Sequence, residues 1–255
     1  MSRLVSAEVL KLRKRRGLVI SAFALTVLPM VIAYTILLSL HAANPAKHGP
    51  AGGLHNFSDS IDLLTMLGVI AAILIGSTLG AGDLSSGVFR ELVVTGRPRV
   101  ALFAARVPAG IAFLWAFIAA GFVLTATAST VFAGSLHAPN GTLLVETAAW
   151  VALVSALALV LALGVSSVVG SRGTTIGIVF AWQIVVTPLL LPIKALGSSR
   201  DALLGAATDH LKPSGVLNQP STEIAMTIAL AAVVLAAWTI VPLALGAWRT
   251  ATRDA

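Results

Sequence analysis

Five histidines and a pair of serines are the side chains in this sequence that could most readily take part in catalysis. Ser166 and Ser167 lie within GVSS, inside a long uncharged stretch. A serine nucleophile at membrane depth would need a histidine or lysine beside it. The histidines all fall in predicted loops: they are His41, His48, His55, His137 and His210. No catalytic pair is therefore expected, and we predict that the serines serve helix packing as small residues.

Three of these histidines, at 41, 48 and 55, recur every seven residues, so a continuous helix would bring them near one face as metal ligands. Proline and glycine interrupt the stretch at Pro45, Gly49 and Pro50, which argues against such a helix. The chain has no cysteine, so thiolate ligands and disulfides are excluded. A solvated loop is favoured over a metal site, and we predict no cofactor or metal in this chain.

Phosphate-binding sequences are the next candidates for chemistry. No GxxxxGK[ST] pattern is present, so the chain has no P-loop. GSRGTT at 170–175 combines glycine with arginine, but no strand precedes it, and a tight turn between two spans is the favoured interpretation. We predict neither an enzyme nor a nucleotide site in this chain.

The composition indicates an integral membrane protein, because 57% of the residues are hydrophobic and only 11% are charged, against about 25% charged in soluble domains. Six uncharged stretches are long enough to cross a hydrocarbon core of about 30 Å as helices. They lack the alternating polarity of β-barrel strands. We therefore predict an all-α protein with one transmembrane domain over residues 1–255. The expected spans are about 17–40, 61–82, 107–134, 144–169, 174–193 and 223–247.

The basic residues fix the expected topology. The segments 1–16, 83–106, 170–173 and 249–255 hold 13 of the 17 lysines and arginines. Because positive residues stay on cytoplasmic loops, both termini are predicted to be cytoplasmic. The net charge of +7 follows from the same rule, so nucleic acid is not an expected partner. The first apolar run of about 24 residues favours an uncleaved span over a signal peptide, whose core is usually about 7–15 residues.

Two further segments are predicted to lie along the membrane surface. Residues 1–16 form an amphipathic helix whose basic side chains suit anionic lipid. The loop 194–221 contains RDALLGAATDHLK at 200–212, which is expected to form one amphipathic helix, extracellular or re-entrant. Pro188 and Pro192 are expected to kink or stop the fifth span just before it.

The spans carry no charged residue away from their ends, whereas ion- or proton-coupled carriers usually keep such residues at membrane depth. This argues against a carrier that powers itself. Gln183 is the most polar residue at depth. It either faces a substrate path or forms a hydrogen bond with a neighbouring helix, and the second interpretation is favoured.

One polar segment, GDLSSGVFRELVVTGRPR at 82–99, separates the second and third spans. It is a short helix candidate with Val88, Phe89 and Leu92 as apolar anchors and with Arg90 and Glu91 as polar contacts. A small apolar patch flanked by charges suits a partner surface. An interfacial helix with snorkelling arginines is the alternative, and the two are compatible.

This segment resembles the first intracellular loop of the ABC type-2 exporter permeases. Asp83 stands at the acidic position of that pattern, Gly87 at its glycine and Leu92 in its Leu-rich turn. Arg99 follows Gly87 by twelve residues, and Arg106 follows after seven more. The chain departs from the pattern with Val88 in place of threonine and Gly96 in place of the turn proline.

The resemblance implies the membrane subunit of a bacterial ABC exporter in the plasma membrane. Such a permease pairs with a second permease, a homodimer or a paralogue, and each docks a separate P-loop ATPase that holds ATP and magnesium. Its cargo is expected to be a hydrophobic or amphipathic small molecule, lipid or peptide. The coupling helix would comprise Asp83, Gly87, Val88, Phe89, Arg90, Glu91, Leu92, Arg97 and Arg99. The alternatives are a stand-alone carrier or channel and a non-transport membrane scaffold.

Overall fold

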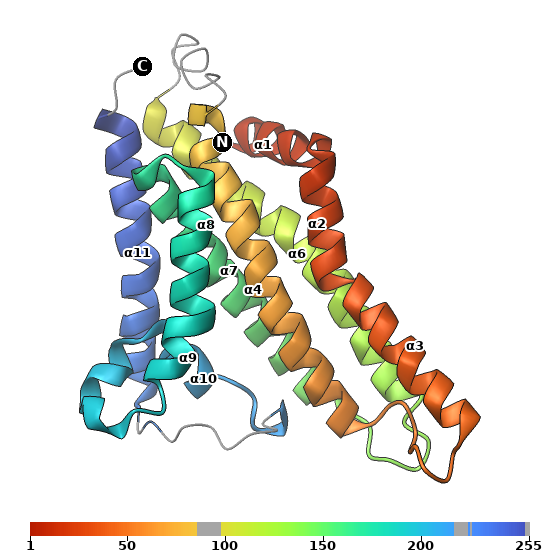
Figure 1. The fold of residues 1–255 in the computed structure, drawn as a ribbon. Helices are drawn as coiled ribbons and strands as arrows, with labels where there is room; N and C mark the ends of the chain where they lie inside the picture. The colour runs from red at the N-terminus through yellow and green to blue at the C-terminus, as the bar shows by residue number, and fades with distance from the viewer. Residues whose placement is uncertain (86–97, 217–223, 225, 253–255) are drawn as a thin grey trace.

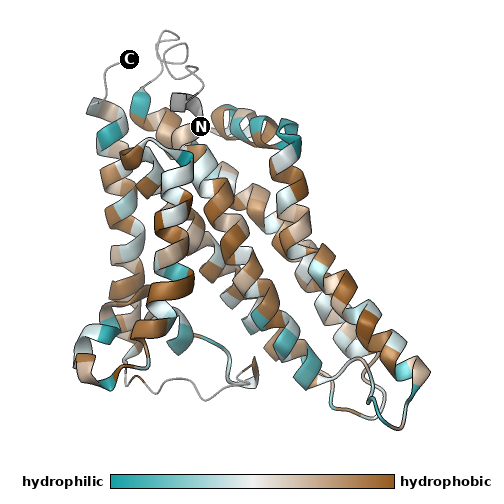
Figure 2. Cartoon of the chain, viewed as in Figure 1, coloured by the Kyte–Doolittle hydropathy of each residue, from teal (hydrophilic) through white to brown (hydrophobic). Residues whose placement is uncertain are grey.

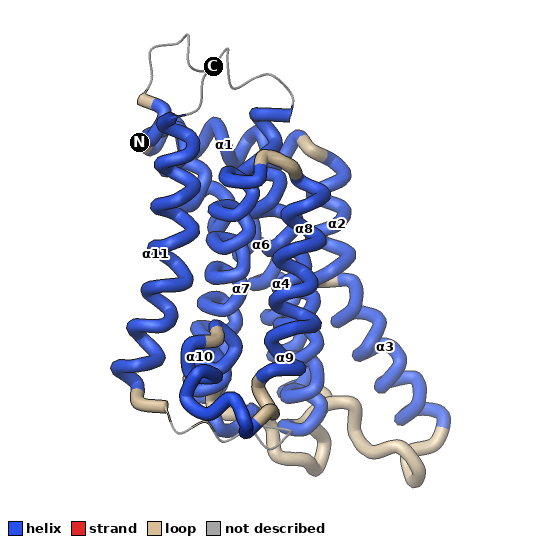
Figure 3. The backbone as a smooth tube through the Cα atoms, turned by 60° about the vertical axis from the view of Figure 1, so that its left-hand side comes forward, coloured by secondary structure: helices blue, strands red, loops and turns tan. Residues whose placement is uncertain are grey.

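A computed structural model describes residues 1–85, 98–216, 224 and 226–252 (Figure 1). Within these ranges the regular secondary structure is entirely helical (Figure 3). In the described part of the chain, six helices are long and apolar enough to cross a membrane, which agrees with the predicted number. They span Arg16–Ala43, Leu54–Gly82, Arg99–Val131, Gly141–Val169, Arg172–Leu190 and Ile228–Thr252. Figure 2 shows hydrophobic residues along their lengths and hydrophilic residues gathered toward their ends.

The first span is built from two helices, α2 (Arg16–Thr26) and α3 (Leu28–Ala43), which meet at Val27. Pro29 explains the break, because proline has no N–H to donate to the carbonyl four residues earlier. The amphipathic helix α1 (Ser2–Lys14) lies across the end of α2 (Figure 1). A helix at the N-terminus was predicted, and the break within the span was not.

The next three long helices are α4 (Leu54–Ser85), α6 (Arg99–Val131) and α7 (Gly141–Val169). The first two begin seven and eight residues before the expected spans at 61 and 107. The expected spans were bounded by charged residues, but a helix continues through charges that lie near its ends. The turn predicted from HAPNG is present, because α6 ends before it and Asn140 caps α7 by accepting a hydrogen bond from the Leu143 N–H at 2.8 Å.

Small residues bring α4 and α7 into backbone contact. A Cβ built on Gly76 would lie 2.4 Å from the Leu159 carbonyl oxygen, and one on Gly80 would lie 2.6 Å from that of Leu163. The Ser166 hydroxyl donates to the Ser77 carbonyl at 2.7 Å across the same interface. Ser166 therefore has a packing role of the kind predicted, whereas the Ser167 hydroxyl donates to the Leu163 carbonyl within α7. These two helices form the centre of the main core.

The fifth span changes its helical type along its length. It consists of α8 (Arg172–Phe180), the π-helix η1 (Ala181–Val186) and α9 (Thr187–Leu190). The predicted tight turn precedes it, with Gly170 at a left-handed φ of 75° that favours glycine. The span stops before Pro192, as predicted, and Pro188 lies in its last turn.

The loop that follows contains three described elements, the last of which is the 3₁₀ helix η3 (Ser214–Val216), and one amphipathic helix was predicted within it. The 3₁₀ helix η2 covers Lys194–Ala202, and α10 covers Leu204–His210. Leu203 separates them with an extended backbone at ψ 137°. The prediction of a single helix over 200–212 was therefore wrong. The extended Leu203 breaks the run, so that only α10 presents the apolar face expected from Leu204 and Ala207, both of which are buried.

The last helix, α11 (Ile228–Thr252), returns to the end of the bundle where α1 lies (Figure 1). This end also carries the end of α4, the start of α6 and the turn at Gly170, and we call it the termini end. The loop end, opposite, carries the connections 44–53, 132–140 and 191–216. The N-terminal helix and the end of α11 at Thr252 therefore lie at one end, as an even number of spans requires.

Buried apolar side chains form two clusters. Among the described residues, the main core joins α1, α2, α3, α4, α6, α7, α8 and η3. The second cluster lies between the end of α9, α10 and the loop-end part of α11. Its buried members are Leu191, Leu203, Ala206, Ala207, Met226, Ala231 and Val234. Trp238 packs against both clusters and links them.

Candidate functional site

The predicted coupling helix lies mostly outside the described residues. Gly87, Val88, Phe89, Arg90, Glu91, Leu92 and Arg97 all belong to that part of the chain. Asp83 lies in the last turn of α4 and Arg99 is the first residue of α6. The Arg99 Nη1 donates to the Ala251 carbonyl of α11 at 3.3 Å, so the flank of the segment contacts the C-terminal helix. The coupling role stays a prediction.

The N-terminal helix packs against the same end of the bundle. Leu12 of α1 is buried in the main core, and the Arg15 guanidinium lies beside Gly82, where an added Cβ would be 3.0 Å from Nη1. Four helices therefore meet at the termini end. They are α1, the two helices α4 and α6 that flank the polar segment, and the C-terminal helix α11. A partner bound there would contact several helices at once.

Arg106 differs from its expected environment. It was grouped with the basic residues of a cytoplasmic loop, but it lies inside α6 and is only 2% exposed. Because α6 begins at Arg99, Arg106 falls two turns into the helix, and α1 packs against this helix. The position two turns inside the helix makes this arginine part of the packed interior at the termini end.

Gln183 is half-buried within the π-helix of the fifth span. Its neighbour Trp182 lies against Trp238 of α11, with ring centroids 6.1 Å apart. The Trp238 indole N–H donates to the Ala202 carbonyl at 2.9 Å, which ties α11 to η2. The π-helix of the fifth span therefore contacts α11 through a pair of aromatic side chains. Neither a substrate role nor a hydrogen-bonding role for Gln183 is tested by this geometry.

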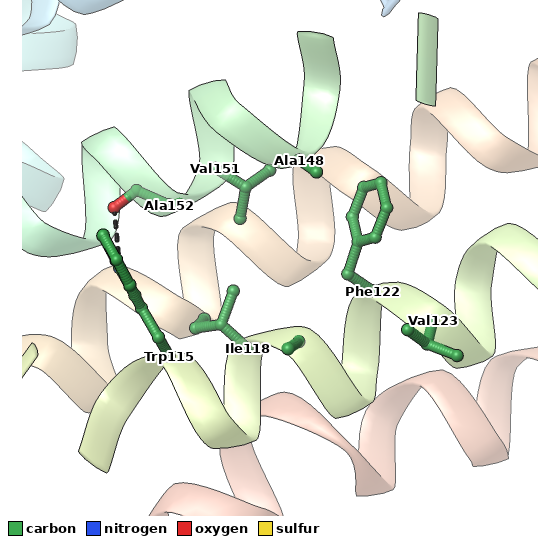
Figure 4. A pocket seen from close by; sticks show the side chains of 8 residues that line it. Trp115, Ile118, Phe122, Val123, Ala148, Val151 and Ala152 are labelled. Atoms are coloured by element: carbon green, nitrogen blue, oxygen red, sulfur yellow. Dashed lines mark hydrogen bonds between the residues drawn. The ribbon is translucent and has the colours of Figure 1, made fainter. Parts of the chain in front are cut away.

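A hollow of about 350 Å³ lies between α6 and α7 (Figure 4). Its lining residues are all apolar: Trp115, Ile118, Ala119, Phe122, Val123, Ala148, Val151 and Ala152. The Trp115 indole N–H donates to the Ala152 carbonyl at 3.0 Å, so its polar atom is already satisfied. The hollow can accept apolar groups, and it offers them no polar anchor.

A polar cluster at the loop end was missed by the sequence analysis. Lys212 Nζ lies 2.6 Å from Asp62 Oδ1 of α4 and 5.5 Å from the ring centroid of Trp150 in α7. The Trp150 indole N–H donates to the Thr208 carbonyl of α10 at 2.8 Å. An ion pair and a cation–π contact thus hold the end of α10 to two core helices. The partners are 150 residues apart, so local sequence patterns carried no signal for them.

Asp209 borders this cluster. Burial by the surrounding protein raises the pKa of its carboxyl above the ordinary 3.8, Asp62 adds to the rise, and Lys212 opposes it. Because folding favours the protonated form, this contribution to stability is full below pH 3.8 and is lost as pH rises through the raised pKa.

We expect Asp209→Asn to remove that part of the pH dependence. The thermal unfolding temperature of the purified chain in detergent, measured from pH 3.5 to 7, should fall less steeply for the variant as pH rises. Asp201→Asn, in the preceding 3₁₀ helix, is the matched control and should follow the unmodified chain. Parallel curves for Asp209→Asn and the unmodified chain would contradict the assignment.

The histidine stretch forms no continuous helix, as predicted, because α3 ends at Ala43 and α4 begins at Leu54. His41 Nδ1 lies 2.8 Å from the His48 carbonyl oxygen, whereas His55 Nδ1 lies 3.2 Å from Asp59 Oδ2. In the described part of the chain, no three histidine or acidic side chains gather in a way that could hold a metal ion.

The sequence matches no model of a known protein family and no curated protein. The resemblance to exporter permeases therefore depends on the polar segment and on the order of the helices.

Proposed function

We propose that this chain is the transmembrane permease subunit of an ATP-binding cassette exporter, powered by a separate P-loop ATPase and paired with a second permease. The observation that carries the proposal is the polar segment 82–99, whose spacing resembles a coupling loop. The helices that flank it, α4 and α6, end and begin at the termini end, together with α1 and the end of α11. A docked ATPase would therefore meet the ends of four helices.

The charge distribution supports an external source of energy. The uncharged stretches hold no carboxylate or amine in mid-span that could bind a proton or ion during transport. The charged side chain buried in a long helix, Arg106, lies toward the termini end of α6. An active transporter subunit without its own coupling group would receive energy from a partner, and ATP with magnesium would bind on that partner.

The positive-inside rule supports a cytoplasmic termini end, where an ATPase would be available. Arg3, Lys14, Arg15, Arg16, Arg99, Arg172 and Arg249 are described residues at or near that end. An apolar hollow between α6 and α7 and the apolar helix faces fit a hydrophobic or amphipathic cargo. The proposed location is the plasma membrane of a bacterium.

Co-purification with a P-loop ATPase is the direct test. The tagged chain would be expressed with the P-loop ATPase encoded beside its gene, purified in detergent and reconstituted in liposomes. We expect a stable complex whose ATP hydrolysis exceeds that of the ATPase alone. Transport by the purified chain without ATP would indicate a stand-alone carrier or channel. Absence of both an ATPase complex and any flux would indicate a scaffold.

A further inference from the structure

Residues 211–216, which follow α10, connect the two hydrophobic clusters, and we call them the strap. Ala206 and Ala207 of α10 belong to the second cluster. Leu211 and Val216, at the two ends of the strap, pack against or within the main core. The strap therefore crosses from the second cluster to the loop ends of α4 and α7.

A charged side chain holds the strap in this position. The Lys212 ammonium lies 2.6 Å from Asp62 of α4, with side-chain exposures of 15% for the lysine and 40% for the aspartate. The ammonium also lies 5.5 Å from the Trp150 ring centroid. This ion pair is a short, charge-assisted hydrogen bond, and its lysine is largely protected from solvent. Such a pair is stronger than a fully exposed surface ion pair.

Two neutral hydrogen bonds accompany the ion pair. The Trp150 indole donates to the Thr208 carbonyl at 2.8 Å, and the Ser58 hydroxyl donates to the Gly215 carbonyl at 3.3 Å. Ser58 is buried, and the strap lies against it. The strap, whose second half is η3, thus lies over a buried polar position near the loop end of α4.

The second cluster is carried by two helices that also reach the main core. Val179 of α8 lies in the main core, whereas Leu191, beyond α9, lies in the second cluster. Likewise, α11 contacts α7 at Pro242, where a Cβ on Gly164 would be 2.4 Å from the Pro242 carbonyl oxygen, and its Val234 lies in the second cluster. Between these two regions the fifth span passes through the π-helix, whereas in α11 the proline lies at the contact with α7 itself.

We propose that the strap is a lid at the loop end, latched by the contact of Lys212 with Asp62 and Trp150. When the latch opens, the second cluster moves away from α4 and α7 about the π-helix and Pro242. Both are irregularities at which helices commonly bend. Opening uncovers Ser58. The inference requires no ATP and no partner, so it stands or fails separately from the proposed transport function.

The chain contains no native cysteine, so a single introduced cysteine can report on this motion without background labelling. Ser58→Cys places a nearly isosteric thiol under the strap. Ser77→Cys places one toward the termini end of the same helix, where the native side chain is fully buried. The purified chain in lipid nanodiscs would be treated with a charged, membrane-impermeant maleimide, and the initial labelling rate of each thiol would be measured.

We expect Lys212→Met to raise the labelling rate at position 58 about tenfold, as loss of a hydrogen bond to a charged group predicts. Methionine keeps the apolar stem and removes the charge. The same replacement of an exposed lysine in η2, Lys194→Met, is the matched control and should leave the rate unchanged. The reversed pair Asp62→Lys with Lys212→Asp should restore much of the protection.

Labelling at position 77 separates opening of the lid from general loss of structure. It should stay slow in every variant, because opening moves the strap and leaves the α4–α7 contact in place. An unchanged rate at position 58 in Lys212→Met would overturn the proposal. An equal rise at positions 58 and 77 would also overturn it, because the lysine would then stabilise the whole fold instead of a lid.

Discussion

Phe89→Asp and Arg90→Glu are each expected to abolish ATPase coupling while leaving membrane insertion intact. Both residues belong to the polar segment and lie outside the described residues. If the segment sits in a groove of the ATPase, Phe89 is the apolar anchor and Arg90 its charged neighbour. Loss of a central aromatic or arginine contact costs about 2 kcal/mol or more, which corresponds to a fall in affinity of more than about tenfold.

The measurement is permease-stimulated ATP hydrolysis by the reconstituted complex, together with the amount of ATPase that co-purifies. The same replacements at the loop end serve as controls. Phe132→Asp changes a phenylalanine that is 41% exposed, and Lys47→Glu reverses an exposed charge. Both should keep normal stimulation. Normal coupling in the Phe89 and Arg90 variants would reject the docking role, even if an ATPase partner had been found.

The number of long helices followed from the sequence because each is an uncharged stretch longer than a bilayer core. Their bounds did not follow from the same rule. The expected spans began after charged residues, yet α4 continues past Asp59, and α6 contains Arg99 and Arg106. Aspartate and arginine are tolerated in a helix near its ends, so charge limits the membrane-buried portion and leaves the helix free to continue.

The contacts that position the helices were less accessible to sequence reasoning. GSTLG at 76–80 has the small-xxx-small spacing that lets helices approach closely, and it was the available signal for the α4–α7 contact. GTTIG at 173–177 has the same spacing, but its two glycines are exposed and neither has a neighbour within 4 Å of an added Cβ. Spacing alone therefore does not tell a filled interface from an open face.

The loop-end cluster could not be predicted at all. Lys212 and Asp62 become neighbours only because α4, α7 and α10 meet in space, and their separation of 150 residues leaves no local pattern. The π-helix is similar, because Pro188 predicted an irregularity without specifying that it would lie over Ala181–Val186. For the candidate site, the sequence supplied the polar segment and the structure supplied the helix ends that surround it.

Gly76→Ala is expected to destabilise the folded chain strongly, because it places a methyl group against backbone. The added Cβ would lie 2.4 Å from the Leu159 carbonyl oxygen and 3.0 Å from the Leu163 N–H nitrogen. Neither atom belongs to a flexible side chain, so α4 and α7 would have to separate. Overpacking a well-packed interior usually costs about 1–3 kcal/mol, and separation of the central helix pair places this variant toward the upper part of that range.

The same substitution at Gly177 is the matched control. This glycine also lies in a spanning helix, but nothing lies within 4 Å of an added Cβ. Alanine there adds helix propensity of up to about 1 kcal/mol and meets no steric cost. In thermal unfolding of the purified chains in detergent, Gly76→Ala should melt well below the unmodified chain and Gly177→Ala at or above it. Equal melting temperatures for the two variants would mean that the close approach of α4 to α7 does not hold the bundle together. Both variants replace a glycine by alanine within a spanning helix. The difference between their melting temperatures therefore reports on the contact between α4 and α7.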